Sequence, residues 1–375
     1  MRPKPAKPQF LPNESIRWES LISDMGRANR ALAEYSGSLR RLPHSGLLLS
    51  PLTVQEAVLS SRIEGTFATM SEVLQFDAGE IPEQESRRHD IEEIINYRRA
   101  LEVAVSELDR RPFTLNLLLK LHKILLTSVR GHNKAPGQFR REQNFIGSRV
   151  GGVETIHFTP PEWNILPDFL GNWEKYYHMD GPDPLVQLAI LHAQFEFLHP
   201  FLDGNGRLGR ILIPIFLYEK RLLASPTFYL SECIEEKKDE YILHLHALGR
   251  HKDAWTQWCG FFLNAVTIQA ERNIKKADAI LDLYERLKRR MIDLTRSQFA
   301  VPLLDALFTQ PVFQASQLQS SPGMPSHQML MILLRKLREG GVLTSLREAR
   351  GRRGQILALQ ELIDLTESRL PIPRE

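Results

Sequence analysis

The sequence predicts a mainly helical fold with one β-hairpin and a C-terminal helix-turn-helix. Two apolar stretches with helical periodicity, 185–198 and 211–223, flank a glycine-rich segment. Two short runs of β-forming residues, 143–146 and 155–159, lie on either side of glycines and predict the hairpin. The third observation is the alternation of helical stretches and turns after residue 296.

A helical run in the N-terminal region starts near Thr53 and ends in Ser60-Ser61-Arg62-Ile63-Glu64-Gly65. Ser60 and Glu64 are four residues apart and share a helix face, and Gly65 fits a helix terminator. A carboxylate in the last turn faces the negative end of the helix dipole, which costs up to about 1 kcal/mol without a nearby cation. We therefore expect a cation beside Glu64. The alternative is an ordinary helix end with a solvated carboxylate.

The predicted hairpin spans residues 143–159 and is closed off by Pro160 and Pro161. In an otherwise helical chain, such a hairpin has exposed edges. These edges can accept an extended segment of another chain by strand addition. The alternative is a surface hairpin without a binding role.

Residues 199–210 read His-Pro-Phe-Leu-Asp-Gly-Asn-Gly-Arg-Leu-Gly-Arg and join the two apolar helices. The segment is expected to cap the second helix, so that the amides of Gly204, Asn205 and Gly206 point outward from its N-terminus. Free amides and the helix dipole both favour an anion there. The segment therefore predicts a binding site for a polyphosphate.

The other polar residues of this segment suit phosphate chemistry. Asp203 is a hard oxygen ligand for Mg²⁺. Arg207 and Arg210, three residues apart in the first turn, share a face and can reach the outer phosphates. His199 is the only titratable group of the segment with an ordinary pKa near neutrality, so it can take a proton from an attacking hydroxyl.

Two other kinds of site fit the sequence less well. A P-loop is excluded because no Gly-x₄-Gly-Lys-Ser/Thr occurs and no strand precedes the segment. Glu196-x-x-His199 has the spacing found in di-iron helix bundles, but such sites need a second copy on another helix and none is found.

From His199 to Arg210 the sequence resembles the signature of Fic-domain proteins, His-x-Phe-x-Asp-Gly-Asn-Gly-Arg-x-x-Arg, at every defined position. The resemblance implies an all-α core that transfers AMP from ATP to a Ser, Thr or Tyr hydroxyl of a target protein or of itself, with Mg²⁺ or Mn²⁺. It implies that His199 is the catalytic base and Asp203 the metal ligand. The implied nucleotide contacts are Gly204, Asn205, Gly206, Arg207, Leu208, Gly209 and Arg210.

Three further segments carry the resemblance. Ser60 to Gly65 is similar to the inhibitory helix of N-terminally inhibited Fic proteins, in which Glu64 would pair with Arg210 and block the γ-phosphate. The hairpin resembles the flap that docks the target hydroxyl near His199. Tyr241 is the candidate to contact adenine or ribose, although the tyrosine that often follows it in the family is Ile242 here. The alternative for such aromatics is a core position, which is expected for Trp255 and Trp258.

The composition is that of an ordinary globular protein, with 42% hydrophobic and 25% charged residues in 375. No apolar run is long enough for a membrane span, and the basic, proline-rich start has no apolar stretch behind it. Cys233 and Cys259 form no metal or redox spacing. We therefore expect a cytoplasmic protein with free thiols and no membrane contact.

The net charge of +3 lies entirely in residues 296–375, which hold 10 Lys and Arg against 7 Asp and Glu. Helices are predicted at 297–309, 314–319 and 326–339, and strands at 342–346 and 355–359. This order resembles a winged helix, with Arg350, Arg352 and Arg353 in its basic wing. Contact with DNA and contact with protein, including a homodimer, both stay open.

The predicted organisation has four parts. They are an N-terminal helical region with the inhibitory helix (1–109), a Fic core (110–268), a connecting helix (269–295) and a winged-helix-like domain (296–375). The function expected is that of an autoinhibited protein adenylyltransferase. The alternatives are a DNA-binding regulator that senses ATP and a phosphodiesterase that removes AMP at the same site.

Overall fold

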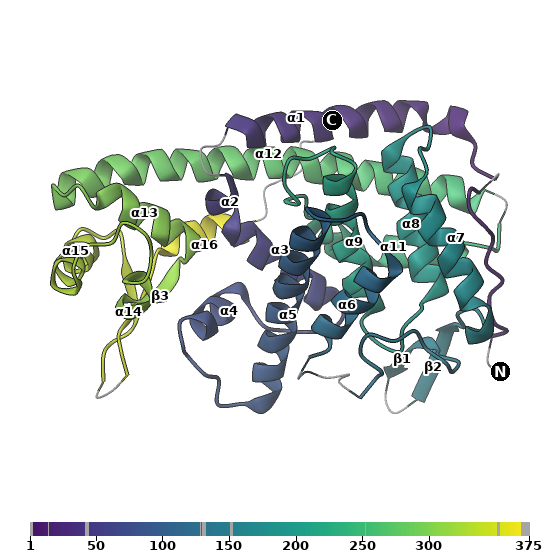
Figure 1. The fold of residues 1–375 in the computed structure, drawn as a ribbon, viewed down its shortest axis with the longest axis horizontal. Helices are drawn as coiled ribbons and strands as arrows, with labels where there is room; N and C mark the ends of the chain where they lie inside the picture. Colours follow the sequence, from purple (N-terminus) through teal and green to yellow (C-terminus); the bar gives the residue numbers. More distant parts are fainter. Residues whose placement is uncertain are drawn as a thin grey trace.

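A computed structural model describes residues 3–13, 15–41, 45–127, 129, 133–150, 153–251, 253–350 and 353–368. It is mainly helical, with one hairpin and one small sheet, as predicted. Figure 1 shows the helix α12 running along the length of the molecule, with α1 beside it and the C-terminal elements gathered at one end. A continuous apolar core joins the N-terminal, central and C-terminal parts.

The N-terminal region is helical. Its elements are η1 Trp18–Leu21, α1 Ile22–Arg41, α2 Ser45–Leu48, α3 Ser50–Ile63, α4 Met70–Asp77 and α5 Glu85–Leu108. The helix predicted from near Thr53 is α3. It starts earlier than expected because Pro51 occupies its first turn, where a missing N–H costs no helical hydrogen bond.

The central part holds the hairpin and the two apolar helices. Its elements are α6 Leu115–Leu125, β1 Ile146–Val150, β2 Val153–Phe158, η2 Trp163–Ile165, α7 Leu166–His178, α8 Pro184–Leu198, α9 Asn205–Glu219, α10 Ser231–Glu236 and α11 Lys238–Ala247. The helix α8 is apolar all round and is therefore buried among other elements. Its start is fixed by Asp183, whose carboxylate accepts hydrogen bonds from the amides of Leu185 and Val186 at 2.9 Å each.

The paired strands of the hairpin lie closer to its turn than the predicted strands do. The strands β1 and β2 pair antiparallel, with Ile146 opposite Phe158. Residues 143–145 are not strand because the side chains of Gln143 and Asn144 bond to the carbonyls of Pro160 and Phe201, which fixes this stretch to neighbouring loops. Residues 151 and 152 lie outside the described residues.

The C-terminal elements are α12 Ala254–Thr295, α13 Ala300–Thr309, β3 Val312–Gln314, α14 Ala315–Leu318, α15 His327–Glu339, β4 Thr344–Arg347, β5 Ile356–Ala358 and α16 Gln360–Glu367. The three predicted helices and two predicted strands are present as α13, α14, α15, β4 and β5. Two further elements, α16 and β3, were not predicted, and β3 completes a sheet in the order β3-β5-β4. The boundary predicted between residues 268 and 269 falls inside α12.

Within the described residues, no helix combines the length and the apolar character needed to cross a membrane. Trp255 and Trp258 are buried, as expected for core residues, and the indole N–H of Trp258 donates to the Ala189 carbonyl at 2.7 Å. This bond joins α12 to α8.

The sequence did not indicate a buried ion pair that joins several of these helices. The Lys276 ammonium on α12 lies 3.2 Å from the Glu232 carboxylate on α10, and the two side chains are 2% and 6% exposed. The same ammonium donates to Gln55 on α3 and to the carbonyl of Thr366 on α16. Burial lowers the pKa of Lys276, against the attraction of Glu232.

We expect Lys276→Met to lower the free energy of unfolding by about 3–5 kcal/mol, because it leaves the Glu232 carboxylate buried without its partner. Urea denaturation followed by circular dichroism measures the loss. The matched control is Lys275→Met, which removes an exposed neighbouring charge and should change stability by less than about 0.5 kcal/mol. Equal stability of both variants would contradict the role of the pair.

Candidate active site

The segment 199–210 joins α8 to α9, as predicted. The helix α8 ends at His199, which has a left-handed backbone with φ of 45°, and α9 starts at Asn205 after Gly204. Gly204 has φ of 78°, a conformation that costs little without a Cβ. The first amides of α9 have no carbonyl to bond within the helix, so they are free to face an anion.

The turn at His199 is held by a buried arginine that the sequence analysis missed. The Arg140 guanidinium donates to the carbonyl of His199 at 2.9 Å and to that of Leu198 at 3.3 Å. It also donates to Pro161 at 2.5 Å. Arg140 therefore fixes the left-handed turn that presents the imidazole, and it ties that turn to the base of the hairpin.

His199 lies in the wall of a cavity of about 550 Å³. Its Nδ1 is buried and has no hydrogen-bond partner among the described residues. Burial lowers the pKa of His199 to about 4. The imidazole is therefore neutral at pH 7 and able to accept a proton.

The cavity lies between the end of α3, the hairpin, α8, α9 and α11. Its lining residues are Ile63, Glu64, Ile146, Gly147, His157, Phe158, Glu196, Phe197, His199, Gly206, Arg210, Lys238, Tyr241, Ile242, Leu245 and His246. Of the predicted site residues, it brings together Glu64, His199, Gly206, Arg210 and Tyr241. Segments that lie far apart in the chain, and that were predicted to be functional, therefore meet at one cavity.

The cation expected beside Glu64 is Arg210. The helix α3 ends at Ile63, and the Glu64 carboxylate accepts from Arg210 Nη2 at 2.7 Å. The same guanidinium donates to the Ser60 hydroxyl at 2.8 Å and to the Ser60 carbonyl at 2.9 Å. Burial acts to raise the pKa of Glu64, but the charge of Arg210 outweighs it and the pKa is lowered. Glu64 is therefore ionised at pH 7.

Gly206 allows this pair to form. A Cβ on Gly206 would collide with the Glu64 carboxylate and lie 3.0 Å from Arg210 Nη1. A glycine is therefore needed where the carboxylate approaches the start of α9.

Arg207 is not among the residues that line the cavity, and the expectation that it reaches the outer phosphates together with Arg210 stays a prediction. It is buried and donates to the Glu93 carboxylate on α5 at 3.1 Å, with the two side chains 4% and 6% exposed. A buried guanidinium needs such a counter-charge, and Glu93 supplies it away from the cavity wall.

Asp203 lies at the start of α9, outside the cavity wall. One carboxylate oxygen accepts from the Gly204 amide at 2.6 Å and lies 3.7 Å from Arg207. The side chain is 40% exposed, so the carboxylate is partly open to solvent. No group of three or more His, Cys, Asp or Glu side chains among the described residues could hold a metal ion. Asp203 fits a divalent cation only if phosphate oxygens supply further ligands.

Three predicted nucleotide contacts have structural roles in the segment, and their contact with a nucleotide stays a prediction. Leu208 is fully buried in the core and its amide bonds to the Gly204 carbonyl. The Asn205 side chain bonds to the amide and carbonyl of Phe201 and shapes the loop. The Glu196 carboxylate occupies the space that a Cβ on Gly209 would need.

Tyr241 lines the cavity with its ring rather than with its hydroxyl. His192 Nδ1 donates to the Gly209 carbonyl at 3.1 Å, so its Nε2 accepts from the Tyr241 hydroxyl at 2.8 Å. Burial lowers the pKa of His192 to about 3, which keeps this neutral form. Tyr241 can therefore offer an aromatic face to a ligand, and its neighbour Ile242 adds an apolar contact.

Glu196 is a cavity residue that the sequence analysis set aside after rejecting a di-iron site. Its Oε1 is buried without a hydrogen-bond partner among the described residues. Burial raises the pKa of Glu196 to about 8, although Arg210 acts to lower it. The carboxyl group is therefore mostly protonated at pH 7. In the sequence, the only indication of a role for Glu196 was that it is the one carboxylate in a mostly apolar helix.

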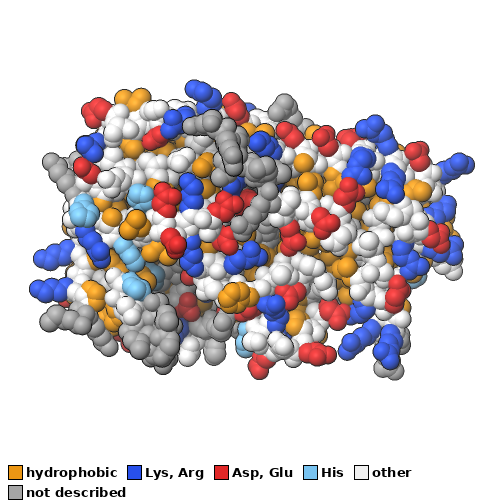
Figure 2. Space-filling view, turned by 180° about the vertical axis from the view of Figure 1, so that it is seen from behind, with side chains coloured by type: hydrophobic (Ala, Val, Ile, Leu, Met, Phe, Trp, Pro, Cys, Tyr) orange, Lys and Arg blue, Asp and Glu red, His pale blue; other side chains and the backbone are white. Residues whose placement is uncertain are grey.

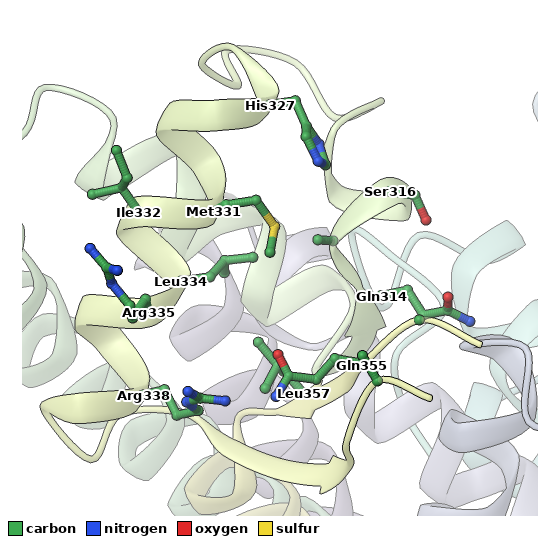
Figure 3. Close-up of a pocket in the computed structure, with 13 residues that line it drawn as sticks. Gln314, Ser316, His327, Met331, Ile332, Leu334, Arg335, Arg338, Gln355 and Leu357 are labelled. Carbon is green, nitrogen blue, oxygen red and sulfur yellow. The ribbon is translucent and has the colours of Figure 1, made fainter. Parts of the chain in front are cut away.

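A second hollow of about 570 Å³ lies in the C-terminal part, between α15 and the strands. Met331 and Leu334 extend into it from α15, and Arg335 and Arg338 lie beside it (Figure 3). It shares no lining residue with the first cavity. Figure 2 shows many Lys and Arg side chains at this end of the molecule, with Asp and Glu among them.

Two domain models of one family match consecutive parts of the chain. The model described as Fic/DOC family N-terminal matches residues 22–106, and the Fic/DOC family model matches residues 112–217. Together they span half of the chain, and the second contains the segment 199–210.

Curated relatives are protein adenylyltransferases by name. A probable protein adenylyltransferase of Aquifex aeolicus is 27% identical over 183 residues, which are 47% of this chain and 51% of that protein. The protein adenylyltransferase Fic of Drosophila ananassae is 26% identical over 202 residues, 54% of this chain and 38% of that protein. The chain thus spans about half the length of the first relative and less of the second.

Solved structures share the fold. A Fic family protein from Desulfovibrio desulfuricans has a TM-score of 0.53 at 18% identity and covers 95% of this chain and 98% of its own. Fic-1 from C. elegans has a TM-score of 0.53 at 20% identity and covers 71% of this chain and 76% of its own. With both domain models matched and the fold shared, this chain belongs to the Fic/DOC family.

Proposed function

We propose that this chain is a protein adenylyltransferase that moves AMP from ATP to a Ser, Thr or Tyr hydroxyl. The observation that carries the proposal is the neutral His199 in the same cavity as Arg210 and the start of α9. A base and an anion site must be this close for a hydroxyl to attack a bound phosphate. The names of the curated relatives support the same activity.

In the proposed reaction, His199 accepts the proton of the target hydroxyl. The hydroxyl oxygen forms a bond to the α-phosphorus of ATP, the bond from that phosphorus to the bridging oxygen breaks, and pyrophosphate leaves. The amides at the start of α9 and the Arg210 guanidinium bind phosphate oxygens and stabilise their charge. A divalent cation, Mg²⁺ or Mn²⁺, bound by Asp203 and phosphate oxygens would neutralise charge on the leaving group.

Target recognition is assigned to the hairpin 143–159. Ile146, Gly147, His157 and Phe158 line the cavity that contains His199. A target segment that pairs with the edge of β1 or β2 would place its hydroxyl at this cavity. Main-chain pairing of this kind fixes the position of the target largely independently of its sequence.

We further propose that the form described here is autoinhibited. Arg210 is engaged by Glu64 and Ser60, so it is not free for a γ-phosphate. ATP would then bind without the α-phosphate aligned for attack. Displacement of the end of α3 would restore the arginine to the phosphate site.

A labelling experiment tests the activity. The Glu64→Gly variant is incubated with ATP labelled at the α-phosphate and with Mg²⁺, alone and with cell lysate, and covalent label on protein is measured. Labelled protein supports AMP transfer. Absence of label from the chain and from every lysate protein would contradict it.

The removal of AMP is the second candidate function, because Glu64 is ionised and lines the same cavity as His199. A carboxylate in that position can orient a water molecule for attack on a phosphodiester. Release of AMP from a labelled protein by the wild-type chain, and its loss in Glu64→Gly, would identify this activity.

For the C-terminal part we propose contact with an acidic protein segment rather than with DNA. Met329, Met331 and Ile332 on α15 are 40%, 43% and 41% exposed. A helix that reads base edges uses polar side chains in these positions. Arg335 and Arg338 beside the hollow favour an acidic partner, which includes an acidic segment of a second copy of this chain.

One arginine of the predicted wing, Arg347, has its side chain engaged within the chain, whereas Arg350 and Arg353 are exposed. Arg347 bonds to Glu80 and to the Gly354 carbonyl, while Arg350 and Arg353 pair with each other through their backbones. Arg352 lies outside the described residues. We therefore expect no retardation of duplex DNA at physiological ionic strength in a gel-shift assay. A shift that disappears in Arg350→Ala with Arg353→Ala would overturn this assignment.

A further inference from the structure

The C-terminal end of α3 is held by two cations from outside the helix. The carbonyls of Ser61 and Arg62 bond to the backbone amides that follow them. The other two are bound by side chains: Ser60 by Arg210 at 2.9 Å and Ile63 by Lys238 Nζ at 2.6 Å. The C-terminal end of a helix carries partial negative charge, so it attracts cations.

Among the described residues, the Lys238 ammonium bonds only to this neutral carbonyl. Within the part of the chain that the structure describes, no carboxylate forms an ion pair with its ammonium. Lys238 is the first residue of α11, partly buried, and it lines the same cavity as Glu64, Gly206 and Arg210. A partly buried cation without a carboxylate, beside the amides at the start of α9, indicates a site for an anion.

We propose that Lys238 is a second cation for the terminal phosphate of a nucleoside triphosphate, and that the Ile63 carbonyl holds it away from that role in the form described here. The inference rests on the proposed function of the same cavity. The end of α3 then presents two substitutes for a phosphate: the Glu64 carboxylate for Arg210 and the Ile63 carbonyl for Lys238. Withdrawal of this one helix end releases both cations together.

The long, flexible stem of lysine makes the exchange feasible. Its ammonium is a point charge that can turn from a carbonyl to a phosphate oxygen without a fixed approach angle. A terminal phosphate carries more charge than a carbonyl dipole, so the exchange is favourable once α3 moves. Lys238 would consequently distinguish ATP from ADP, because only ATP has the third phosphate.

Calorimetric titration of ATP and ADP tests this assignment. The background is Glu64→Gly with His199→Ala, in which the helix end is loosened and turnover is blocked. In this background, Lys238→Met should weaken ATP binding about tenfold, as expected for one lost charge-assisted hydrogen bond, and change ADP binding less than about twofold. Lys238→Arg should keep the preference for ATP.

The matched control is Lys237→Met, which removes the neighbouring lysine from outside the cavity wall and should leave both affinities unchanged. Equal weakening of ATP and ADP by Lys238→Met, or no change in either, would overturn the assignment. A folding defect would also appear as equal weakening, and the melting temperature of each variant identifies it. The binding result does not depend on AMP transfer, so a failure of the proposed activity would be seen separately in the labelling experiment.

Discussion

Glu64→Gly should raise the rate of self-labelling with AMP roughly 10- to 100-fold, because it frees Arg210 to bind a phosphate by a charge-assisted hydrogen bond. In the structure that guanidinium donates to Glu64 at 2.7 Å and to Ser60 at 2.8 Å. Removal of the carboxylate leaves the arginine with a neutral hydroxyl and carbonyl, which a triphosphate can displace. AMP incorporated per protein molecule over time measures the change.

Two controls separate the carboxylate from the backbone. Glu64→Ala removes the same group without adding the flexibility of glycine, so it should activate as strongly as Glu64→Gly. Glu64→Gly with Arg210→Ala should return to low incorporation, because the two changes act on one interaction. Equal incorporation by the wild type and Glu64→Gly would show that the end of α3 is an ordinary helix end.

His199→Ala should lower the rate of AMP transfer by ~10²–10⁴-fold in the activated Glu64→Gly background. His199 lines the cavity, and burial lowers its pKa to about 4, which keeps it neutral through the physiological range. Phosphate binding depends on Arg210 and on the amides of α9, so ATP affinity should change little. Single-turnover rates and equilibrium binding measure the two effects independently.

The matched control for His199→Ala is His246→Ala, which removes another imidazole of the same cavity that lies on α11. This variant should keep the transfer rate within about tenfold if only His199 takes the proton. Transfer at the wild-type rate by His199→Ala would contradict the mechanism. A parallel loss of ATP affinity would show instead that His199 is needed to shape the site.

The sequence predicted the parts of the site that local backbone geometry determines. Glycines at 204 and 206, the helix end at Glu64 and the apolar helix before His199 each leave a signal within a few residues. The ion pair between Glu64 and Arg210 was expected from the family resemblance together with the unfavourable place of a carboxylate at a helix end. These features needed no knowledge of the tertiary structure.

The unpredicted parts are contacts between residues far apart in the chain. Arg140 lies 59 residues from His199, Arg207 lies 114 from Glu93, and Lys238 lies 175 from Ile63. Each involves a charged residue whose partner the sequence around it does not indicate. The strand β3 was missed for a different reason, since three residues are too few to show alternation.

The length of α12 determines how the chain can be divided. Its 42 residues extend about 63 Å and pass through the predicted boundary without a break. Ala277, Ile280, Leu283 and Leu287 on the far half are buried in the continuous core. A fragment ending at residue 268 would lose the hydrogen bonds of a continuous helix and the second half of this core. The C-terminal part is therefore joined to the rest of the chain by one helix and one continuous core.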